Sequence, residues 1–438
     1  MAFVAVLALG SAGPASAAAD ENAGSPYLIP SPLPDGVIDG QPERAELRTD
    51  GNPSADVTQA LLEASLTSPD LGISAVEWLP ETGKLAVYAT ADEATFAAAM
   101  SEAKLDGAVE HRPAVLDAIG KAELANDIVG TNGKLGSGDR VVEVEPSLDG
   151  SEVRVVLDES NRGRTISADA RSEISAKAKA KGKGKGVTVT VEYGAAAQPA
   201  LRNHAANPST YSGAVMTRVG ANSACTTGYR MTQTSGNVPV MGSAHHCHAG
   251  VEGQSWKYTT VDGYPVAKAY SAYGAGLSNG DVSVWKGPMA DHMLPGIFIG
   301  DHTVSGSGVY SIKGAIHSVV GANVCYSGSF SGTVCSNTIM ATGLTVCYTG
   351  LPCYNNIVRT QQATGIPALG NGDSGGPVYS TSSGIYATGI ISGMSNGTAT
   401  CTGEPGSSAT GGRKCSATGL YAPIAELMTA GYGLNYIP

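Results

Sequence analysis

Residues 369–380 read LGNGDSGGPVYS and place a single serine, Ser374, among four glycines, an aspartate and a proline. Glycine permits backbone angles that other residues avoid and lets a second chain approach closely. A serine presented in this way can be an exposed nucleophile, next to backbone N–H groups that bind an oxyanion. The alternative interpretation is a Gly-rich surface turn. The positions of the histidines in the chain distinguish between these possibilities.

The pattern Gly372-x-Ser374-x-Gly376 also fits the nucleophile elbow of the α/β-hydrolases. In that fold the order along the chain is nucleophile, acid and then histidine. The last histidine of this chain is His317, so no base follows Ser374. The α/β-hydrolase interpretation is therefore excluded, and a base has to be sought upstream of the serine.

The first 19 residues, MAFVAVLALGSAGPASAAA, combine a short apolar run with small residues of the Ala-x-Ala type. This pattern predicts a secretory signal peptide over 1–19 and an extracellular location, although the usual basic start is absent because the first arginine is Arg44. No later apolar run reaches about 18 residues, so we expect no membrane span. With 42% hydrophobic and 15% charged residues, the 438-residue chain is neither disordered nor fibrous in bulk.

Composition divides the chain near residue 209. Residues 1–209 carry 18 Lys and Arg against 30 Asp and Glu, a net charge of −12, whereas residues 210–438 carry 9 against 8, a net charge of +1. All eight cysteines lie between Cys225 and Cys415, which predicts four disulfides in one secreted domain. We expect a domain over 20–204 and another over 205–438, joined by a segment at 195–210 that lacks apolar periodicity.

The first domain contains two similar units. Alternating stretches with turns at 81–83 and 149–150 predict two β-hairpins, each followed by a helical stretch, and the second unit ends with a strand at 186–194. Five lysines follow in alternate positions: Lys177, Lys179, Lys181, Lys183 and Lys185. They fall on all sides of a helix, so we interpret them as a solvated helix end or linker rather than a nucleic-acid surface. We expect no nucleic-acid partner.

The second domain has many short β-like runs separated by Gly, Ser and Asn turns, which is typical of a β-sandwich or a pair of barrels. Within it, residues 242–250 read GSAHHCHAG. These histidines and Cys247 could form a soft-metal cluster. A disulfide explains every cysteine better and no second ligand cluster exists, so we expect no metal and no cofactor.

A histidine directly before a cysteine, followed far downstream by GDSGGP, resembles the chymotrypsin-fold serine proteases. Residues 321–339, GANVCYSGSFSGTVCSNTI, are similar to the Cys-x-Ser-Gly loop of the secreted bacterial branch, the streptogrisins and α-lytic protease. The resemblance covers about 211–438. It implies an all-β, chymotrypsin-like double β-barrel preceded by an α+β pro-region, with His246 as the general base. His245 and His248 would then be surface residues or would lie behind the site.

The acid should lie between His246 and Ser374. The candidates are Glu252, Asp262, Asp281, Asp291, Asp301 and Asp373. Asp281 opens a strand-like run, NGDVSVW, that leads into the core, and a buried carboxylate needs a partner such as a histidine N–H. The aspartate of the family occupies the same kind of position. We therefore predict Asp281 as the acid, with Asp301 second.

The resemblance also implies the remaining site residues. The N–H groups of Gly372 and Ser374 would form the oxyanion hole. Ala368, six residues before the nucleophile, would lie at the base of the primary pocket, and Ser392, Gly393 and Met394 would bind substrate backbone and form a wall. No acid lies between Asp301 and Asp373, which predicts an uncharged pocket, although Glu404 could reach its rim.

Two positions depart from the family pattern. The usual cysteine four residues before the serine is Gly370, and the arginine that follows the first loop cysteine and pairs with the aspartate before the serine is Tyr326. Asp373 then needs another partner: a tyrosine hydroxyl, a different arginine or a new N-terminus. Pairing of near neighbours predicts four disulfides, of which the resemblance supports the first two: Cys225–Cys247, Cys325–Cys335, Cys347–Cys353 and Cys401–Cys415.

Together these features predict a secreted serine endopeptidase that is made as a precursor, with polypeptide substrates and its own pro-region over 20–204 as partners. We expect a monomer. The alternative is a non-catalytic secreted binding module on a protease scaffold.

Overall fold

In the computed structural model, the described residues are 52–130, 133–158, 166–181, 186–194, 198–199, 211–218, 224–248, 255–257, 267–270, 279–286, 293–302, 309–381, 383–398, 400–403 and 413–436. The predicted signal peptide, most of the segment 195–210, and the residues Glu252, Asp262, Asp291 and Glu404 lie outside these ranges.

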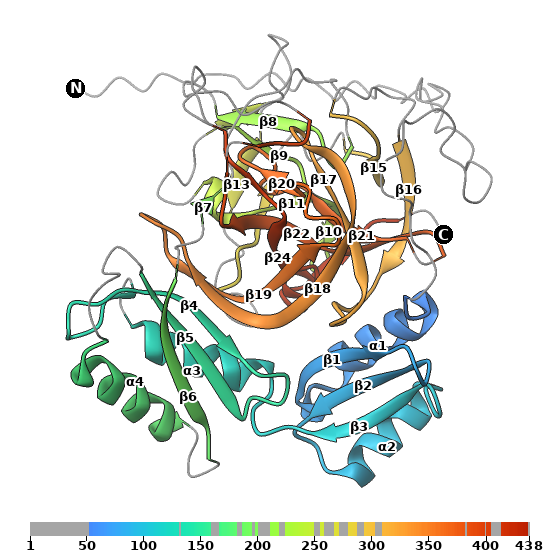
Figure 1. Ribbon diagram of the computed structural model, residues 1–438. Coiled ribbons are helices and arrows are strands. Elements are labelled where there is room, and N and C mark those ends of the chain that lie inside the picture. The colour runs from blue at the N-terminus through green and yellow to red at the C-terminus, as the bar shows by residue number, and fades with distance from the viewer. Residues whose placement is uncertain are drawn as a thin grey trace, which may run out of the picture. The chain divides into compact units, whose positions relative to one another are not determined.

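Two units of the same topology precede the all-β part of the chain, in the order helix, strand, strand, helix, strand (Figure 1). The first consists of α1 (Ala55–Thr67), β1 (Ile73–Leu79), β2 (Lys84–Ala89), α2 (Glu93–Glu102) and β3 (Val109–Pro113). The second consists of α3 (Ala118–Val129), β4 (Val141–Pro146), β5 (Glu152–Asp158), α4 (Ala168–Lys181) and β6 (Thr188–Gly194). In each unit the first two strands form an antiparallel hairpin, and the third strand runs parallel to the second.

Sequence patterns predicted both hairpins and the helix after each, but not the helices α1 and α3 or the strand β3. Two helices begin where a short acidic side chain satisfies a free N–H group of the first turn. Asp92 accepts from the N–H of Thr95 at the start of α2, and Asp117 accepts from Gly120 at the start of α3. Lys177 of α4 pairs with Glu173 and donates to the carbonyl of Ile128, so it has a structural role.

Alternation in the second unit separates an apolar face from a charged face. Val144, Val153 and Val155 are buried against the apolar faces of α3 and α4. On the other face, Arg154 pairs with the carboxylates of Glu143, Glu145 and Glu192. The period of two in these strands accounts for both faces.

The second unit also pairs with the β-domain. The edge strand β4 adds antiparallel to β18 (Gly332–Cys347), with Val144 opposite Thr345. Arg359 of β19 (Cys353–Gln362) binds both Glu143 and Glu145, the carboxylates that Arg154 also holds. Burial raises the pKa of Glu143, while the two arginines lower it. The contact between the two parts therefore combines a shared sheet with a partly buried charge network.

The first half of the β-domain is an eight-stranded sheet in which every neighbouring pair is antiparallel. Its order is β25 (Tyr432–Leu434), β10 (Arg230–Gln233), β11 (Val238–Ser243), β14 (Ser283–Lys286), β13 (Ala267–Tyr270), β12 (Ser255–Lys257), β8 (Val215–Arg218) and β9 (Ala224–Thr226). The C-terminal strand β25 thus pairs with the first half of the domain, next to the strands that lead to His246 and from Asp281.

Six strands of the second half close into a barrel, because the pairing returns to the strand from which it starts. The ring is β22 (Ile385–Ser395), β21 (Pro377–Ser380), β17 (Asn323–Gly328), β18, β19, β24 (Thr418–Pro423) and again β22. Further short strands are β15 (Gly296–Phe298) and β16 (Val309–Ala315), which extend the sheet beyond β22, and the pair β20 (Leu369–Gly370) and β23 (Cys415–Ser416). The short helix α6 (Ala425–Thr429) follows β24.

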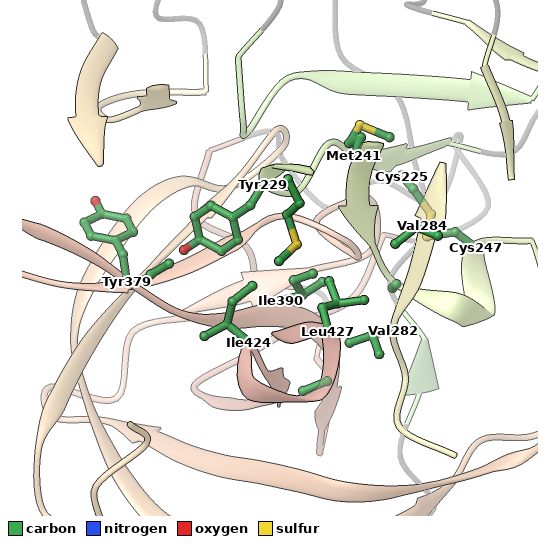
Figure 2. Close-up of a cluster of buried hydrophobic side chains, with 14 of the residues drawn as sticks. Cys225, Tyr229, Met241, Cys247, Val282, Val284, Tyr379, Ile390, Ile424 and Leu427 are labelled. Atoms are coloured by element: carbon green, nitrogen blue, oxygen red, sulfur yellow. A yellow bond between two sulfur atoms is a disulfide. The ribbon is translucent and has the colours of Figure 1, made fainter. Parts of the chain in front are cut away.

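The two halves share a hydrophobic core. Met241 and Val284 from the first half are buried in one cluster with Ile390 of β22 and Leu427 of α6. Figure 2 shows this cluster, with the Cys225–Cys247 disulfide next to Val284. Because the same core fixes β11, β14 and β22, it holds in place the chain segments that carry His246, Asp281 and Ser392.

The predicted fold class, an all-β domain preceded by an α+β region, is confirmed. Within the part of the chain that the structure describes, no helix has the length and apolar character needed to cross a membrane.

Candidate active site

His246 lies in a single 3-10 turn, His245–Cys247, directly after β11. The disulfide between Cys247 and Cys225 anchors this turn to β9. The Nδ1 atom of His246 lies 2.7 Å from Oδ2 of Asp281, and its Nε2 atom lies 2.8 Å from Oγ of Ser374. The structure therefore brings together the three residues that the sequence predicted as base, acid and nucleophile. All three side chains are buried.

The partners of His246 determine its tautomer. An ionised carboxylate can only accept hydrogen bonds, so Nδ1 carries the proton that Asp281 receives. The unprotonated Nε2 then accepts the hydroxyl proton of Ser374. In this arrangement the imidazole is ready to remove a proton from the serine, and the resulting imidazolium would lie against a buried negative charge.

Asp281 directly precedes β14, and the neighbouring Val282 and Val284 are buried in the core. Its carboxylate accepts from three donors: the His246 Nδ1–H, the His246 backbone N–H at 2.9 Å and the Ser392 hydroxyl at 2.6 Å. Burial by itself would raise the pKa of Asp281, but the charge of His246 and these hydrogen bonds hold it below the usual value. Asp301, the second candidate, lies instead beside His302.

The glycines around Ser374 fit a crowded turn. Gly372 has φ +105° and Gly375 has φ +87°, a region that residues with a side chain rarely adopt. A Cβ at Gly375 would lie 2.1 Å from the Ser243 Oγ atom. The Ser374 carbonyl accepts from the backbone N–H of Thr226, whose side chain donates to the Gly372 carbonyl. The turn that presents the nucleophile is thus fixed against β9.

The neighbouring peptides orient the predicted oxyanion donors. The Asn371 carbonyl accepts from Nε of Arg413, and the Asp373 carbonyl accepts from the N–H of Gly376. The N–H and C=O of a trans peptide point in opposite directions, and no peptide in the described chain is cis. The N–H groups of Gly372 and Ser374 therefore point away from Arg413 and Gly376, respectively.

Asp373 has five hydrogen-bond donors and one cation. Oδ1 accepts from the N–H groups of Phe330 and Ser331, and Oδ2 accepts from the Ser331 hydroxyl and the Gly370 N–H. Nη2 of Arg413 lies 3.2 Å from Oδ2. Of the three possible partners that the sequence left open, the structure contains the different arginine.

Arg413 reaches Asp373 from the loop that the Cys401–Cys415 disulfide closes. Its guanidinium also donates to the carbonyls of Asn371 and Thr402, and only 3% of the residue is exposed. Tyr326 stands at the position of the family's arginine, but its hydroxyl lies 2.7 Å from Oγ1 of Thr360. Sequence reasoning did not identify Arg413, since its only signal was its place inside a disulfide loop.

The four disulfides are the four pairs expected from the sequence: Cys225–Cys247, Cys325–Cys335, Cys347–Cys353 and Cys401–Cys415. The position before Ser374 that carries cysteine in the family is Gly370, and a Cβ there would lie 2.2 Å from Sγ of Cys415. The Cys401–Cys415 bridge therefore approaches the chain that leads to Ser374 without being bonded to it.

The residues predicted for substrate binding lie on two elements. Ser392, Gly393 and Met394 are on β22, while Ala368 directly precedes β20. Ala368 and Met394 are fully buried in one apolar cluster with Tyr326 and Ile391. No charged side chain belongs to that cluster. Glu404, which could have reached this region, lies outside the described residues.

A strand from the N-terminal part of the chain pairs with β22 at these residues. The short strand β7 (Gln198–Pro199) is antiparallel to β22, with Gln198 opposite Met394 and Pro199 opposite Gly393. The direction of β7 runs toward Ser392, whose carbonyl lies 3.5 Å from Oγ of Ser374. The edge of β22 next to the nucleophile is thus occupied by the chain itself.

The other two histidines of the GSAHHCHAG stretch are buried and lie behind His246, not at the surface. Nδ1 of His245 lies 2.9 Å from the Tyr354 hydroxyl, and the His248 ring packs against Trp285. In the described ranges, no group of three or more His, Cys, Asp or Glu side chains is arranged to hold a metal ion.

No known family model matches the chain, and no curated protein matches it. Two solved structures are similar to it. One is a serine protease specific for glutamic acid, described as using a novel histidine triad in substrate binding, with 23% identity over 51% of this chain and 100% of that chain and a TM-score of 0.37. The other is an α-lytic protease homologue, N4, with 22% identity over 52% of this chain and 99% of that chain and a TM-score of 0.35.

Both proteins are of the kind that the sequence motifs resemble. At these TM-scores the likeness carries no information about the chemistry of this chain, which depends on the contacts described above.

Replacing Arg413 by methionine should lower the free energy of unfolding by about 3 kcal/mol, because the buried carboxylate of Asp373 then loses its cation. Denaturant unfolding of the full chain measures this change. In the double variant Arg413→Met, Asp373→Asn no buried charge remains unpaired, and part of the loss should be recovered. Equal stability of the wild type and Arg413→Met would contradict the role assigned to this pair.

Proposed function

We propose that this chain is a secreted serine endopeptidase that is made as a precursor, with Ser374 as nucleophile, His246 as general base and Asp281 as the acid that orients the base. The observation that carries the proposal is the continuous hydrogen-bonded array from Ser374 through His246 to Asp281, all within 2.8 Å and all buried. A serine in this array is activated as a nucleophile without a metal or an organic cofactor.

In the proposed reaction, Oγ of Ser374 attacks the carbonyl carbon of a peptide bond while Nε2 of His246 takes the hydroxyl proton. The negative oxygen of the tetrahedral intermediate is stabilised by the N–H groups of Gly372 and Ser374. When the C–N bond breaks, His246 gives its proton to the leaving amine. Water then attacks the acyl-enzyme with His246 again as the base, and Ser374 is restored.

The competing function is that of a non-catalytic binding module on the same scaffold. The orientation of the array argues against it, since each of its polar groups faces the partner that proton transfer needs. A serine-directed phosphonate reagent distinguishes the two functions, because only an activated Ser374 would be labelled.

We further propose that residues 20–204 are a pro-region that occupies the site before cleavage. Its strand β7 pairs with Gly393 and Met394, which are the backbone positions where an extended substrate would bind. Asp373 already has Arg413 as its partner, so cleavage need not create a new N-terminus to pair with it. Cleavage would then activate the enzyme by removing an occupant rather than by reorganising the site.

The pro-region would also assist folding. Barrels are dominated by contacts between residues far apart in the chain, which makes their folding slow. The strand β4 offers its edge to β18, the first strand of the long hairpin in the second barrel. A unit that folds early and carries such an edge could template the pairing of β18 with β19.

Replacing Ser374 or His246 by alanine should lower peptidase activity by a factor on the order of 10⁴ or more, because the array then lacks its nucleophile or its base. The matched control is His245→Gln, which keeps a polar group opposite Tyr354 and should retain most of the activity. Hydrolysis of a peptide substrate measures all three variants. If His245→Gln were the inactive one, the assignment of the base would be wrong.

Peptides with an apolar residue before the scissile bond should be cut faster than peptides with Lys or Arg there, because Ala368 and Met394 belong to an uncharged, apolar cluster. Cleavage of a peptide library by the mature enzyme gives this profile. A profile dominated by Lys or Arg would contradict the prediction and would make Glu404 the residue to test next.

N-terminal sequencing of the secreted product should give a first residue between positions 200 and 211. The physical reason is that β7 runs toward Ser392 and Ser374, so the bonds presented for cleavage follow Pro199. The Ser374→Ala chain should keep its N-terminal region. A mature N-terminus upstream of residue 198 would show that β7 is not part of the segment removed.

A further inference from the structure

Tyr348 lies behind the proposed catalytic array, next to Ser392. It follows β18 directly, inside the short loop that the Cys347–Cys353 disulfide closes. Its side chain is fully buried, and its hydroxyl lies 2.6 Å from Oγ of Ser392. Ser392 in turn donates to Oδ2 of Asp281 at 2.6 Å. The array of short contacts thus continues from Asp281 through Ser392 to Tyr348.

Proton counting gives this chain of hydrogen bonds a direction. A serine hydroxyl has one proton, and an ionised carboxylate has none to donate. Ser392 therefore spends its proton on Asp281, and the bond between Ser392 and Tyr348 must use the tyrosine proton. Tyr348 donates to Ser392, and Ser392 donates to Asp281. Successive hydrogen bonds of the same direction strengthen one another, so the tyrosine makes Ser392 a better donor to the carboxylate.

The position of Tyr348 is fixed from several sides. Its backbone carbonyl accepts from Nη2 of Arg140 at 3.0 Å, which ties it to the N-terminal part of the chain. Its ring lies 5.8 Å from the ring of His246, measured between centroids. On the other side is Gly393, where a Cβ would lie 2.6 Å from the tyrosine oxygen. A residue larger than glycine at position 393 would push the hydroxyl away from Ser392.

We propose that Tyr348 is a positioning residue of the active site, which acts through Ser392 to fix the orientation and the hydrogen bonding of Asp281. This rests on the proposed function for its kinetic consequence, but its effect on the titration of His246 does not depend on turnover. With the tyrosine hydroxyl removed, Ser392 donates less strongly, so the carboxylate attracts the imidazolium more strongly and His246 keeps its proton to a higher pH.

Other ionisable groups near His246 and Asp281 would be unchanged by that substitution. In the described part of the chain they are His245 and His248 on either side of the His246–Cys247 pair, Tyr354 on β19, and Glu426 of α6, which lies against Gly280. Burial raises the pKa of Glu426 to about 7, so its titration is to be followed separately in the same spectra.

The test compares Tyr348→Phe with Tyr421→Phe. Tyr421 is also fully buried, and its hydroxyl also binds a serine, Ser318, at 3.0 Å, so the control removes the same kind of bond at a place that does not reach Asp281. Both variants are made in the full chain with Ser374→Ala, so that the N-terminal region stays attached. The titration of the His246 ring is followed by NMR, and the same substitutions with Ser374 present give the dependence of kcat/KM on pH.

We expect the His246 pKa to rise by about half a unit in Tyr348→Phe, since the net effect of one hydrogen bond corresponds to roughly that shift. With Ser374 present, kcat should fall about two- to tenfold with little change in KM, and the acidic limb of the profile should move to higher pH. Tyr421→Phe should leave the titration and the acidic limb where they are.

An unmoved His246 titration in Tyr348→Phe, or the same shift in Tyr421→Phe, would overturn the proposal. A wild-type chain without peptidase activity and without phosphonate labelling would instead contradict the proposed function, while the titration would still decide the role of Tyr348.

Discussion

The site depends on the burial of one carboxylate, Asp281. A charged group without solvent is tolerated only when its oxygens are satisfied by hydrogen bonds and a compensating charge. Here the donors come from the backbone and ring of His246 after β11 and from Ser392 on β22, on opposite sides of the shared core. The requirement therefore joins the two halves of the β-domain, and the cleft between them becomes the place where Ser374 meets its base.

A second buried carboxylate, Asp373, lies next to Ser374 and has a different task. Its partners come from the 330–331 turn, from Gly370 and from Arg413, so it fixes the loop of the nucleophile rather than a proton acceptor. The loss of an arginine at position 326 is compensated from a remote loop, because a guanidinium can reach the same oxygen from either side. The hydroxyl of Tyr326 is satisfied elsewhere, by Thr360.

The N-terminal region contacts the β-domain at places that matter for the site. Its β4 strand extends the sheet beside β18, Arg140 holds the carbonyl of Tyr348, and β7 pairs with β22. These contacts follow one strand of the barrel from the outer pairing to the residues next to the nucleophile. Mutual strand pairing of this kind combines folding assistance and inhibition in one region, since both use backbone hydrogen bonds that any extended chain can make.

The sequence by itself determined the class of fold, the order of the two parts and the residues His246, Asp281 and Ser374, because local glycine patterns, alternation and a specific motif reside in short stretches. It also determined the disulfide partners, which are close along the chain. Arg413 and Tyr348 could not be found in this way. Arg413 reaches Asp373 across 40 residues, and Tyr348 reaches Ser392 across 44. Only the packed barrel brings these groups together, since a side-chain contact between remote strands depends on their register and curvature, which no local pattern encodes.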